Sequence, residues 1–153
     1  MMSQRLHVQF AGLELRSPII VSAGPCTRSV KQIKRLAEAG VGSVVTKSTF
    51  LEEEYSEVIK PYAPGRFPDC RPKYVKAGED TYVYVAGFAE VPAEVWAVSL
   101  RELRDTVDIP IIASQIATSL KGHVKMAQLF EAAGAAALEF DFVCLCLTWI
   151  RQS

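Results

Sequence analysis

Four short apolar runs constrain the fold of this chain more than any other feature of its sequence. The runs occupy residues 19–23, 43–47, 109–116 and 135–140, and none of them alternates polar with apolar residues. Runs of this length and kind are typical of strands that are covered on both faces. Segments with the apolar spacing of helices separate the runs, so the sequence predicts an α/β fold with a parallel sheet.

Helix start and stop signals lie between the runs. Thr27 or Ser29 can cap a helix that Gly40 ends, and Pro92 opens a second helix that runs to about residue 104. A third helix, from about residue 122 to 133, is ended by Gly134. These signals place one helix after each of the first three runs, as a parallel sheet requires.

Two segments fall outside this alternation. Residues 6–16 alternate polar with apolar residues around Ala11-Gly12, which predicts a short hairpin. Residues 50–90 have no clear period and are rich in proline, with a possible strand at 82–85. We interpret the glutamate run at 52–54 as a solvated face of this long loop, a kind of loop that is usually functional.

Composition excludes several classes of partner. The chain has 153 residues, with 17 Lys and Arg against 17 Asp and Glu, so no net charge attracts nucleic acid. No stretch approaches the roughly 18 apolar residues of a membrane span, and the amino terminus lacks a signal-peptide pattern. We therefore expect a cytoplasmic protein that binds neither nucleic acid nor membrane.

The cysteines and histidines do not form a metal-ligand pattern. We interpret Cys26, Cys70, Cys144 and Cys146 as reduced thiols and expect no metal site, because no CxxC spacing or nearby histidine accompanies them. His7 and His123 lack carboxylates or cysteines at ligand spacing, so we expect surface or helix-capping roles for both.

Polar and small residues end the four apolar runs. Two architectures fit the order of elements: a doubly wound open sheet, or the first half of an eight-stranded barrel. Barrel enzymes place their chemistry at the carboxyl ends of the strands. A lysine at the end of a buried strand is costly without a partner, which favours a functional interpretation. The residues at these ends are Ala23, Gly24, Lys47, Ser48, Ser114 and Asp141.

Three segments resemble one enzyme family. Residues 22–25 (SAGP), 35–49 (RLAEAGVGSVVTKST) and 132–144 (AAGAAALEFDFVC) are similar to the flavin-dependent dihydroorotate dehydrogenases and to the pyrimidine-reducing domain of dihydropyrimidine dehydrogenases. The resemblance covers roughly residues 5–144 in the family's order. It implies a TIM (β/α)8 barrel with FMN over its mouth, of which this chain holds the N-terminal hairpin and the first four β/α units.

The resemblance also implies roles for residues of the first three runs. Ala23 and Gly24 would lie under the flavin, where small residues let the backbone approach the ring. Lys47 would stabilise negative charge on the reduced flavin and on substrate oxygens, with Ser48 beside it. Ser114 stands where the family places an Asn or Ser side chain against the flavin.

The fourth run departs from the family's motif. The family has Glu-Leu-Asn-Leu-Ser-Cys-Pro, whereas this chain has Glu-Phe-Asp-Phe-Val-Cys-Leu at residues 139–145. Asp141 replaces the Asn that contacts both flavin and pyrimidine, and an ionised Asp only accepts hydrogen bonds. Cys144 falls where class-one dihydroorotate dehydrogenases keep their catalytic base, with a structural thiol as the alternative.

The last residues differ from the family altogether. We expect residues 1–141 to form the half-barrel, and residues 142–153 to be a divergent tail left by a truncation or frame shift. The later strands that build the phosphate site for FMN are absent from this chain. Whether the chain is an enzyme therefore stays open.

Two functions remain open. The first is the oxidation of dihydroorotate to orotate in pyrimidine metabolism by an FMN-dependent oxidoreductase, with uracil or thymine reduction as the alternative reaction at the same C5–C6 bond. The second is a non-catalytic half-barrel that forms a homo-oligomer through its open sheet edges.

Overall fold

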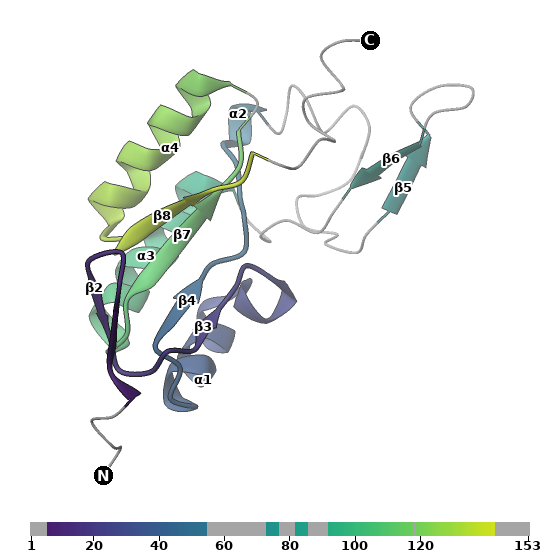
Figure 1. Ribbon diagram of the computed structural model, residues 1–153. Helices are drawn as coiled ribbons and strands as arrows, with labels where there is room; N and C mark the ends of the chain where they lie inside the picture. Colours follow the sequence, from purple (N-terminus) through teal and green to yellow (C-terminus); the bar gives the residue numbers. More distant parts are fainter. Residues whose placement is uncertain (1–5, 55–72, 77–81, 86–91, 118, 143–153) are drawn as a thin grey trace.

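The computed structural model describes residues 6–54, 73–76, 82–85, 92–117 and 119–142. It contains one four-stranded parallel sheet and two separate two-stranded antiparallel sheets (Figure 1). The predicted α/β fold with a parallel sheet is therefore confirmed. Three of the four cysteines, Cys70, Cys144 and Cys146, lie outside the described residues, as does most of the predicted tail.

The parallel sheet follows the order of the chain. Its strands are β3 (Ile20–Val21), β4 (Ser43–Val45), β7 (Ile111–Gln115) and β8 (Ala137–Phe140), and each is paired with the next in parallel. The four predicted strands are thus present, each shorter than its apolar run. Because all four strands point the same way, their carboxyl ends meet at one edge of the sheet.

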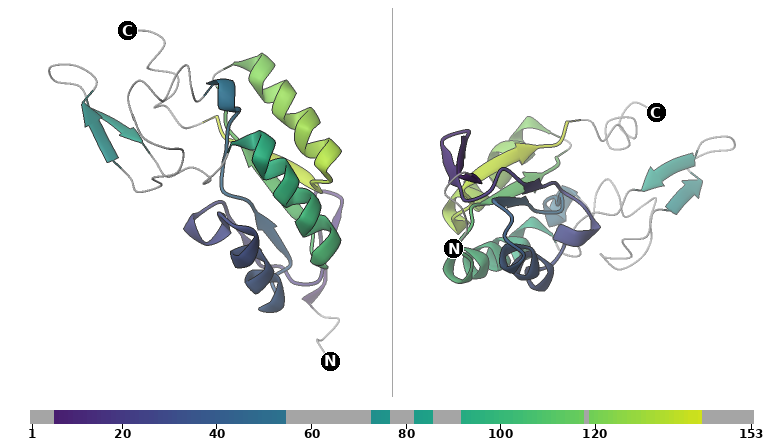
Figure 2. Two further views of the ribbon diagram at one scale, coloured as in Figure 1. Left: turned by 180° about the vertical axis from the view of Figure 1, so that it is seen from behind. Right: turned by 60° about the horizontal axis from the view of Figure 1, so that its bottom comes forward.

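Three helices cover one face of this sheet. They are α1 (Val30–Glu38), α3 (Ala93–Thr106) and α4 (Leu120–Ala133), and all three lie on the same side of the strands (Figure 2). None of the described helices is long and apolar enough to cross a membrane. The fully buried helical side chains of the shared core include Ile33, Leu103, Met126 and Phe130.

Local signals set the helix ends. The Ser29 side chain accepts a hydrogen bond from the Gln32 N–H at the start of α1. Gly134 has a φ of 89° and ends α4 in the left-handed conformation that glycine adopts without strain. The cap at Ser29 and the end of α4 are where the sequence predicts them, while α3 extends two residues beyond residue 104, to Thr106.

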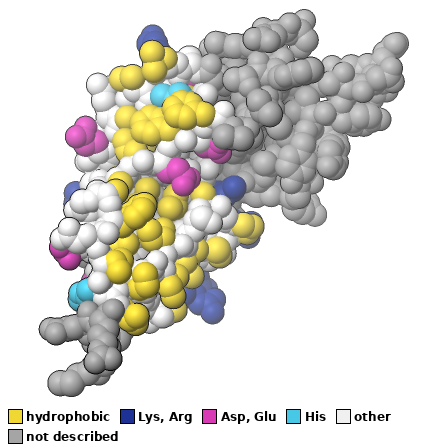
Figure 3. Space-filling view, viewed as in Figure 1, with side chains coloured by type: hydrophobic (Ala, Val, Ile, Leu, Met, Phe, Trp, Pro, Cys, Tyr) yellow, Lys and Arg dark blue, Asp and Glu magenta, His cyan; other side chains and the backbone are white. Residues whose placement is uncertain are grey.

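The other face of the sheet carries exposed apolar side chains. Apolar side chains are also exposed at the two edge strands: Ile19, beside β3, is 59% exposed, and Phe140 at the end of β8, whose ring lies against His123 of α4, is 41% exposed. Figure 3 shows hydrophobic side chains gathered over the sheet on this side. The prediction that residues 19–23 form a strand covered on both faces is wrong, because the residues of β3 are half-buried and, among the described strands, β3 is an edge strand that pairs only with β4.

The predicted N-terminal hairpin is present. It consists of β1 (Val8–Phe10) and β2 (Leu13–Leu15), joined through Ala11 and Gly12, which both have positive φ. Leu15 is buried against Gly42, the residue that precedes β4. The hairpin therefore packs at the amino ends of the strands, opposite the edge where the predicted site residues lie.

Two further elements belong to the segment between β4 and α3. The predicted strand at residues 82–85 is β6 (Tyr82–Val85), which pairs with β5 (Lys73–Lys76), a strand that the sequence reasoning missed. The glutamates at 52–54 form a short helical turn, α2 (Glu52–Glu54).

Candidate functional site at the carboxyl edge of the sheet

The candidate site residues come from all four strands of the parallel sheet. Ala23 and Gly24 follow β3, Lys47 and Ser48 follow β4, Ser114 lies within β7, and Asp141 follows β8. Parallel pairing in chain order places these positions along the same edge.

The turn that follows β3 is hydrogen-bonded to the segment that follows β4. The Thr27 hydroxyl oxygen accepts a hydrogen bond from the Gly24 N–H at 3.0 Å, and the Thr27 carbonyl accepts one from the Lys47 N–H at 3.1 Å. Among the described residues, a Cβ added at Gly24 would meet only the Ser22 carbonyl oxygen, at the ordinary contact distance of 3.7 Å. The described residues therefore leave room for at least one further carbon atom beside the Gly24 backbone.

Lys47 supplies a cation at this edge. Its side chain is half-buried, and within the described part of the chain its ammonium forms no hydrogen bond or ion pair. A partly buried lysine without such a partner is available to a negatively charged ligand.

Two serines and a glutamate form a chain of hydrogen bonds across the sheet. The Ser48 and Ser114 hydroxyl oxygens are 2.9 Å apart, and the Ser114 hydroxyl donates to Glu139 Oε1 at 2.8 Å. Ser114 is fully buried and Ser48 is 6% exposed, whereas Glu139 is exposed. Among the predicted site residues, the structure thus brings Ser48 and Ser114 into direct contact.

Sequence reasoning missed Glu139 as a site residue. Ser114 and Glu139 are paired in register on β7 and β8, on the face opposite to that of Ala113 and Leu138, which pack with the helices. The signal that could have found Glu139 is the two-residue period of a strand, because Glu139 lies two residues before Asp141.

Asp141 is held at the edge by its backbone. Its N–H donates to the Gln115 carbonyl at 2.9 Å, which continues the pairing of β8 with β7 past the last residue of β8. Its side chain is half-buried. Cys144, the candidate base, lies outside the described residues.

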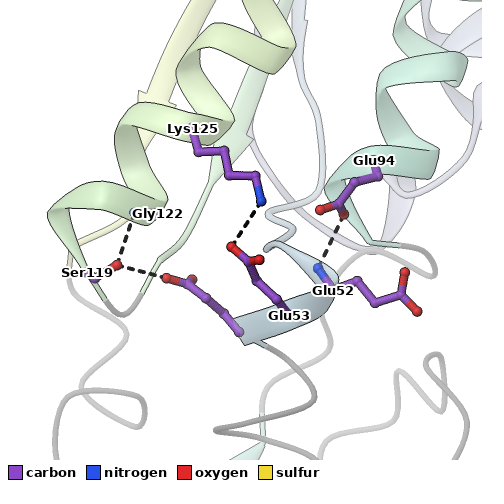
Figure 4. A network of polar contacts seen from close by, with 7 residues as sticks. Glu52, Glu53, Glu94, Ser119, Gly122 and Lys125 are labelled. Atoms are coloured by element: carbon purple, nitrogen blue, oxygen red, sulfur yellow. Dashed lines mark hydrogen bonds and ion pairs between the residues drawn. The ribbon is translucent and has the colours of Figure 1, made fainter.

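Side chains and backbone of the turn α2 bind to α3 and to the N-terminal part of α4, including its cap Ser119 (Figure 4). Glu53 pairs with Lys125 of α4 at 3.0 Å, and Glu54 accepts a hydrogen bond from the Ser119 hydroxyl at 3.1 Å. The Glu94 side chain accepts a hydrogen bond from the Glu52 N–H at 3.2 Å. The prediction of a solvated loop face is wrong for Glu54, which is 8% exposed because it packs at the start of α4.

His123 is enclosed rather than exposed. Its side chain is 6% exposed, and its ring centroid lies 5.6 Å from that of Phe140 and 5.0 Å from that of Phe142. Burial lowers the pKa of His123 below its usual value, while the charge of Glu54 raises it by a smaller amount. The expected surface role for His123 is therefore wrong, whereas His7 is exposed as expected.

A pocket of about 380 Å³ lies beyond the opposite ends of the strands, lined by residues such as Lys34, Glu38 and Val107. Arg16, also in its lining, is bound to Asp108 at 2.7 Å and to the Val41 carbonyl at 3.1 Å. Lys34 pairs with Glu102 at 2.7 Å. These cations are already paired, so the pocket is a weaker candidate than the carboxyl edge.

Comparison with known proteins adds no family to this description, because no protein-family model matches the sequence. Within the described ranges, no three side chains of His, Cys, Asp or Glu are grouped so as to hold a metal ion. The case for a site therefore rests on the residues of the carboxyl edge.

Proposed function

We propose that residues 1–141 form the N-terminal half of a TIM barrel of the dihydroorotate and dihydropyrimidine dehydrogenase type. The order of the strands supports this proposal most directly, since β3, β4, β7 and β8 follow one another without reversal. A doubly wound sheet reverses its strand order and carries helices on both faces. Here α1, α3 and α4 share one core on one face, as the outer helices of a barrel do.

The residues of the carboxyl edge fit the ring of FMN. Ala23 and Gly24 would accept the face of the flavin, with space beside the Gly24 backbone, and Lys47 would stabilise negative charge on it. Ser48 and Ser114 would offer hydroxyl groups at the same edge. When bound, FMN supplies the two-electron exchange with the C5–C6 bond of the substrate.

The substrate in this proposal is a dihydropyrimidine. Lys47 and Asp141 would orient its polar groups, and Cys144 would accept the proton from C5. Asp141 can only accept hydrogen bonds when it is ionised, so it would favour ring N–H groups over carbonyl oxygens. Dihydroorotate is the first candidate, and uracil or thymine reduction is the alternative reaction.

Anaerobic reduction of FMN tests this function. The protein is mixed with FMN and dihydroorotate, or with FMN and dihydrouracil, and the visible absorbance of the flavin is followed. We expect substrate-dependent bleaching that is slower in Lys47→Met and unchanged in Lys121→Met, an exposed lysine on α4. No bleaching with either substrate would overturn the proposed reaction.

A second candidate is a non-catalytic half-barrel that pairs with another copy of itself. The exposed apolar face of the sheet and its two edge strands favour this candidate. Two copies would bring together about eight strands, the number that closes a barrel filled by side chains. Pairing of β8 in one copy with β3 in the other would remove both open edges.

Sedimentation equilibrium tests this pairing. We expect a dimer, with Ile19→Lys shifted toward monomer because Ile19 is exposed beside the edge strand β3. Val98→Lys is the matched control, since Val98 is 58% exposed on α3, away from the sheet face. A wild-type monomer that unfolds cooperatively would contradict self-association.

A further inference from the structure

The hydrogen-bond chain across the carboxyl edge has a fixed direction. It joins Ser48 Oγ to Ser114 Oγ over 2.9 Å and Ser114 Oγ to Glu139 Oε1 over 2.8 Å. Each serine hydroxyl has one hydrogen to donate, and an ionised carboxylate can only accept. The Ser114 hydrogen therefore lies on the bond to Glu139, and the Ser48 hydrogen must lie on the bond to Ser114.

Because its hydrogen lies on the bond to Ser114, the Ser48 hydroxyl can offer a ligand only the lone pairs of its oxygen. The Ser114 backbone N–H is already bound to Thr46 Oγ1 at 3.1 Å, so it does not compete for the hydroxyl oxygens. Ser114 is fully buried, so water is excluded from the middle of this hydrogen-bond chain. Ser48 is next to Lys47, just after β4, and is 6% exposed; the remaining lone pair of its oxygen makes it an acceptor.

We propose that Glu139 is a specificity-determining positioning residue, which fixes Ser48 as a hydrogen-bond acceptor so that the edge selects a ligand with an N–H group. Glu139 acts through two hydroxyl groups, Ser114 and Ser48, without contacting the ligand. On the proposed function, on which this step rests, the selected group is a ring N–H of the dihydropyrimidine. A ligand that presents a carbonyl oxygen to Ser48 meets repulsion between lone pairs.

Two substitutions separate this role from a merely structural one. Glu139→Gln places an NH₂ group that can donate to Ser114, which frees the Ser114 hydrogen for Ser48 and turns the Ser48 hydrogen outward. Ser114→Ala removes the middle hydroxyl and leaves Ser48 free to rotate. Glu131→Gln, at an exposed position on α4, is the matched control.

Neutron diffraction of the ligand-free protein shows which way each hydroxyl hydrogen of the hydrogen-bond chain points. We expect the deuterium on Ser114 Oγ to point at Glu139 and the deuterium on Ser48 Oγ to point at Ser114. A Ser114 deuterium directed at Ser48 would overturn the inference, whatever the protein binds.

Ligand binding tests the consequence. Calorimetric titration of the FMN-loaded protein uses dihydrouracil and its 1-methyl and 3-methyl derivatives, each of which lacks one N–H. We expect one methyl derivative to bind about tenfold more weakly than dihydrouracil, the worth of one hydrogen bond. We expect the ratio of the affinities for dihydrouracil and for this methyl derivative to approach one in Glu139→Gln and Ser114→Ala. In Glu131→Gln the ratio should stay about tenfold.

Two other outcomes have distinct meanings. Equal affinities of the wild type for all three compounds would overturn the inferred selection of an N–H group. No binding of any of them would count against the proposed function, and the neutron result would then decide the direction of the hydrogen-bond chain by itself.

Discussion

His123 is a titratable residue whose side chain is buried. Phe140 and Phe142 flank it, and its Nδ1 atom has no hydrogen-bond partner among the residues that the structure describes. Glu54 is the charged group that acts on it, and this carboxylate offsets only part of the effect of burial on its pKa. The neutral imidazole is therefore the form that the fold favours.

The pH dependence of stability follows from this burial. The unfolded chain protonates His123 near pH 6.5, while the folded chain holds its pKa lower. Below about pH 6.5 the unfolded state binds more protons, so the free energy of unfolding decreases as the pH falls toward the folded pKa. Above about pH 6.5 the contribution of His123 is fully present.

Urea unfolding of His123→Phe and of the control His7→Phe, between about pH 7 and about pH 5.5, measures this effect. We expect His7→Phe to keep the decrease in stability of the wild type and His123→Phe to reduce it. Identical slopes in the two variants would contradict a role for His123.

At the scale of elements, Gly42 determines how the hairpin meets the sheet. A Cβ at Gly42 would overlap the Ser17 carbonyl oxygen and lie 3.2 Å from the Leu15 side chain, so only glycine fits between β2 and β4. We expect Gly42→Ala to lower the free energy of unfolding by about 2 kcal/mol or more, as overpacked cores do.

Gly24→Ala is the matched control for this substitution. Within the described part of the chain, a Cβ at Gly24 meets only the Ser22 oxygen, at 3.7 Å, so the stability of this variant is expected to stay near that of the wild type. Chemical denaturation compares the two variants. Equal stability of Gly42→Ala and the wild type would show that the hairpin does not pack against β4 in this way.

The cap of α4 gives a second prediction at this scale. Ser119 accepts a hydrogen bond from the Gly122 N–H and donates one to Glu54. Ser119→Ala is expected to cost about 1 kcal/mol in the free energy of unfolding. Ser119→Thr, which keeps the hydroxyl, is expected to retain most of the stability, and an equal loss in both variants would contradict the capping role.

Features encoded locally could be predicted from the sequence. The cap at Ser29, the helix end at Gly134 and the four strands follow from nearby residues. The exposure of β3 and the burial of Glu54 depend on neighbours distant in the chain, which spacing does not reveal. The same holds for Glu139, whose contact with Ser114 requires the register between two strands.

At the scale of the whole molecule, the sheet has one face covered by helices and one that carries exposed apolar side chains. This asymmetry, together with strand order that follows the chain, is the basis for proposing a half-barrel. The carboxyl edge gathers a cation, two hydroxyl groups and an open backbone from separate strands. The proposed flavin site uses all of these features.

Fluorescence titration of FMN with the protein tests this proposed site most directly. The account predicts saturable quenching with one FMN per chain, about tenfold weaker binding in Lys47→Met because one charge-assisted contact is lost, and unchanged binding in Lys121→Met. Fluorescence that stays unquenched at excess protein, or equal affinities for FMN in wild type and Lys47→Met, would contradict it.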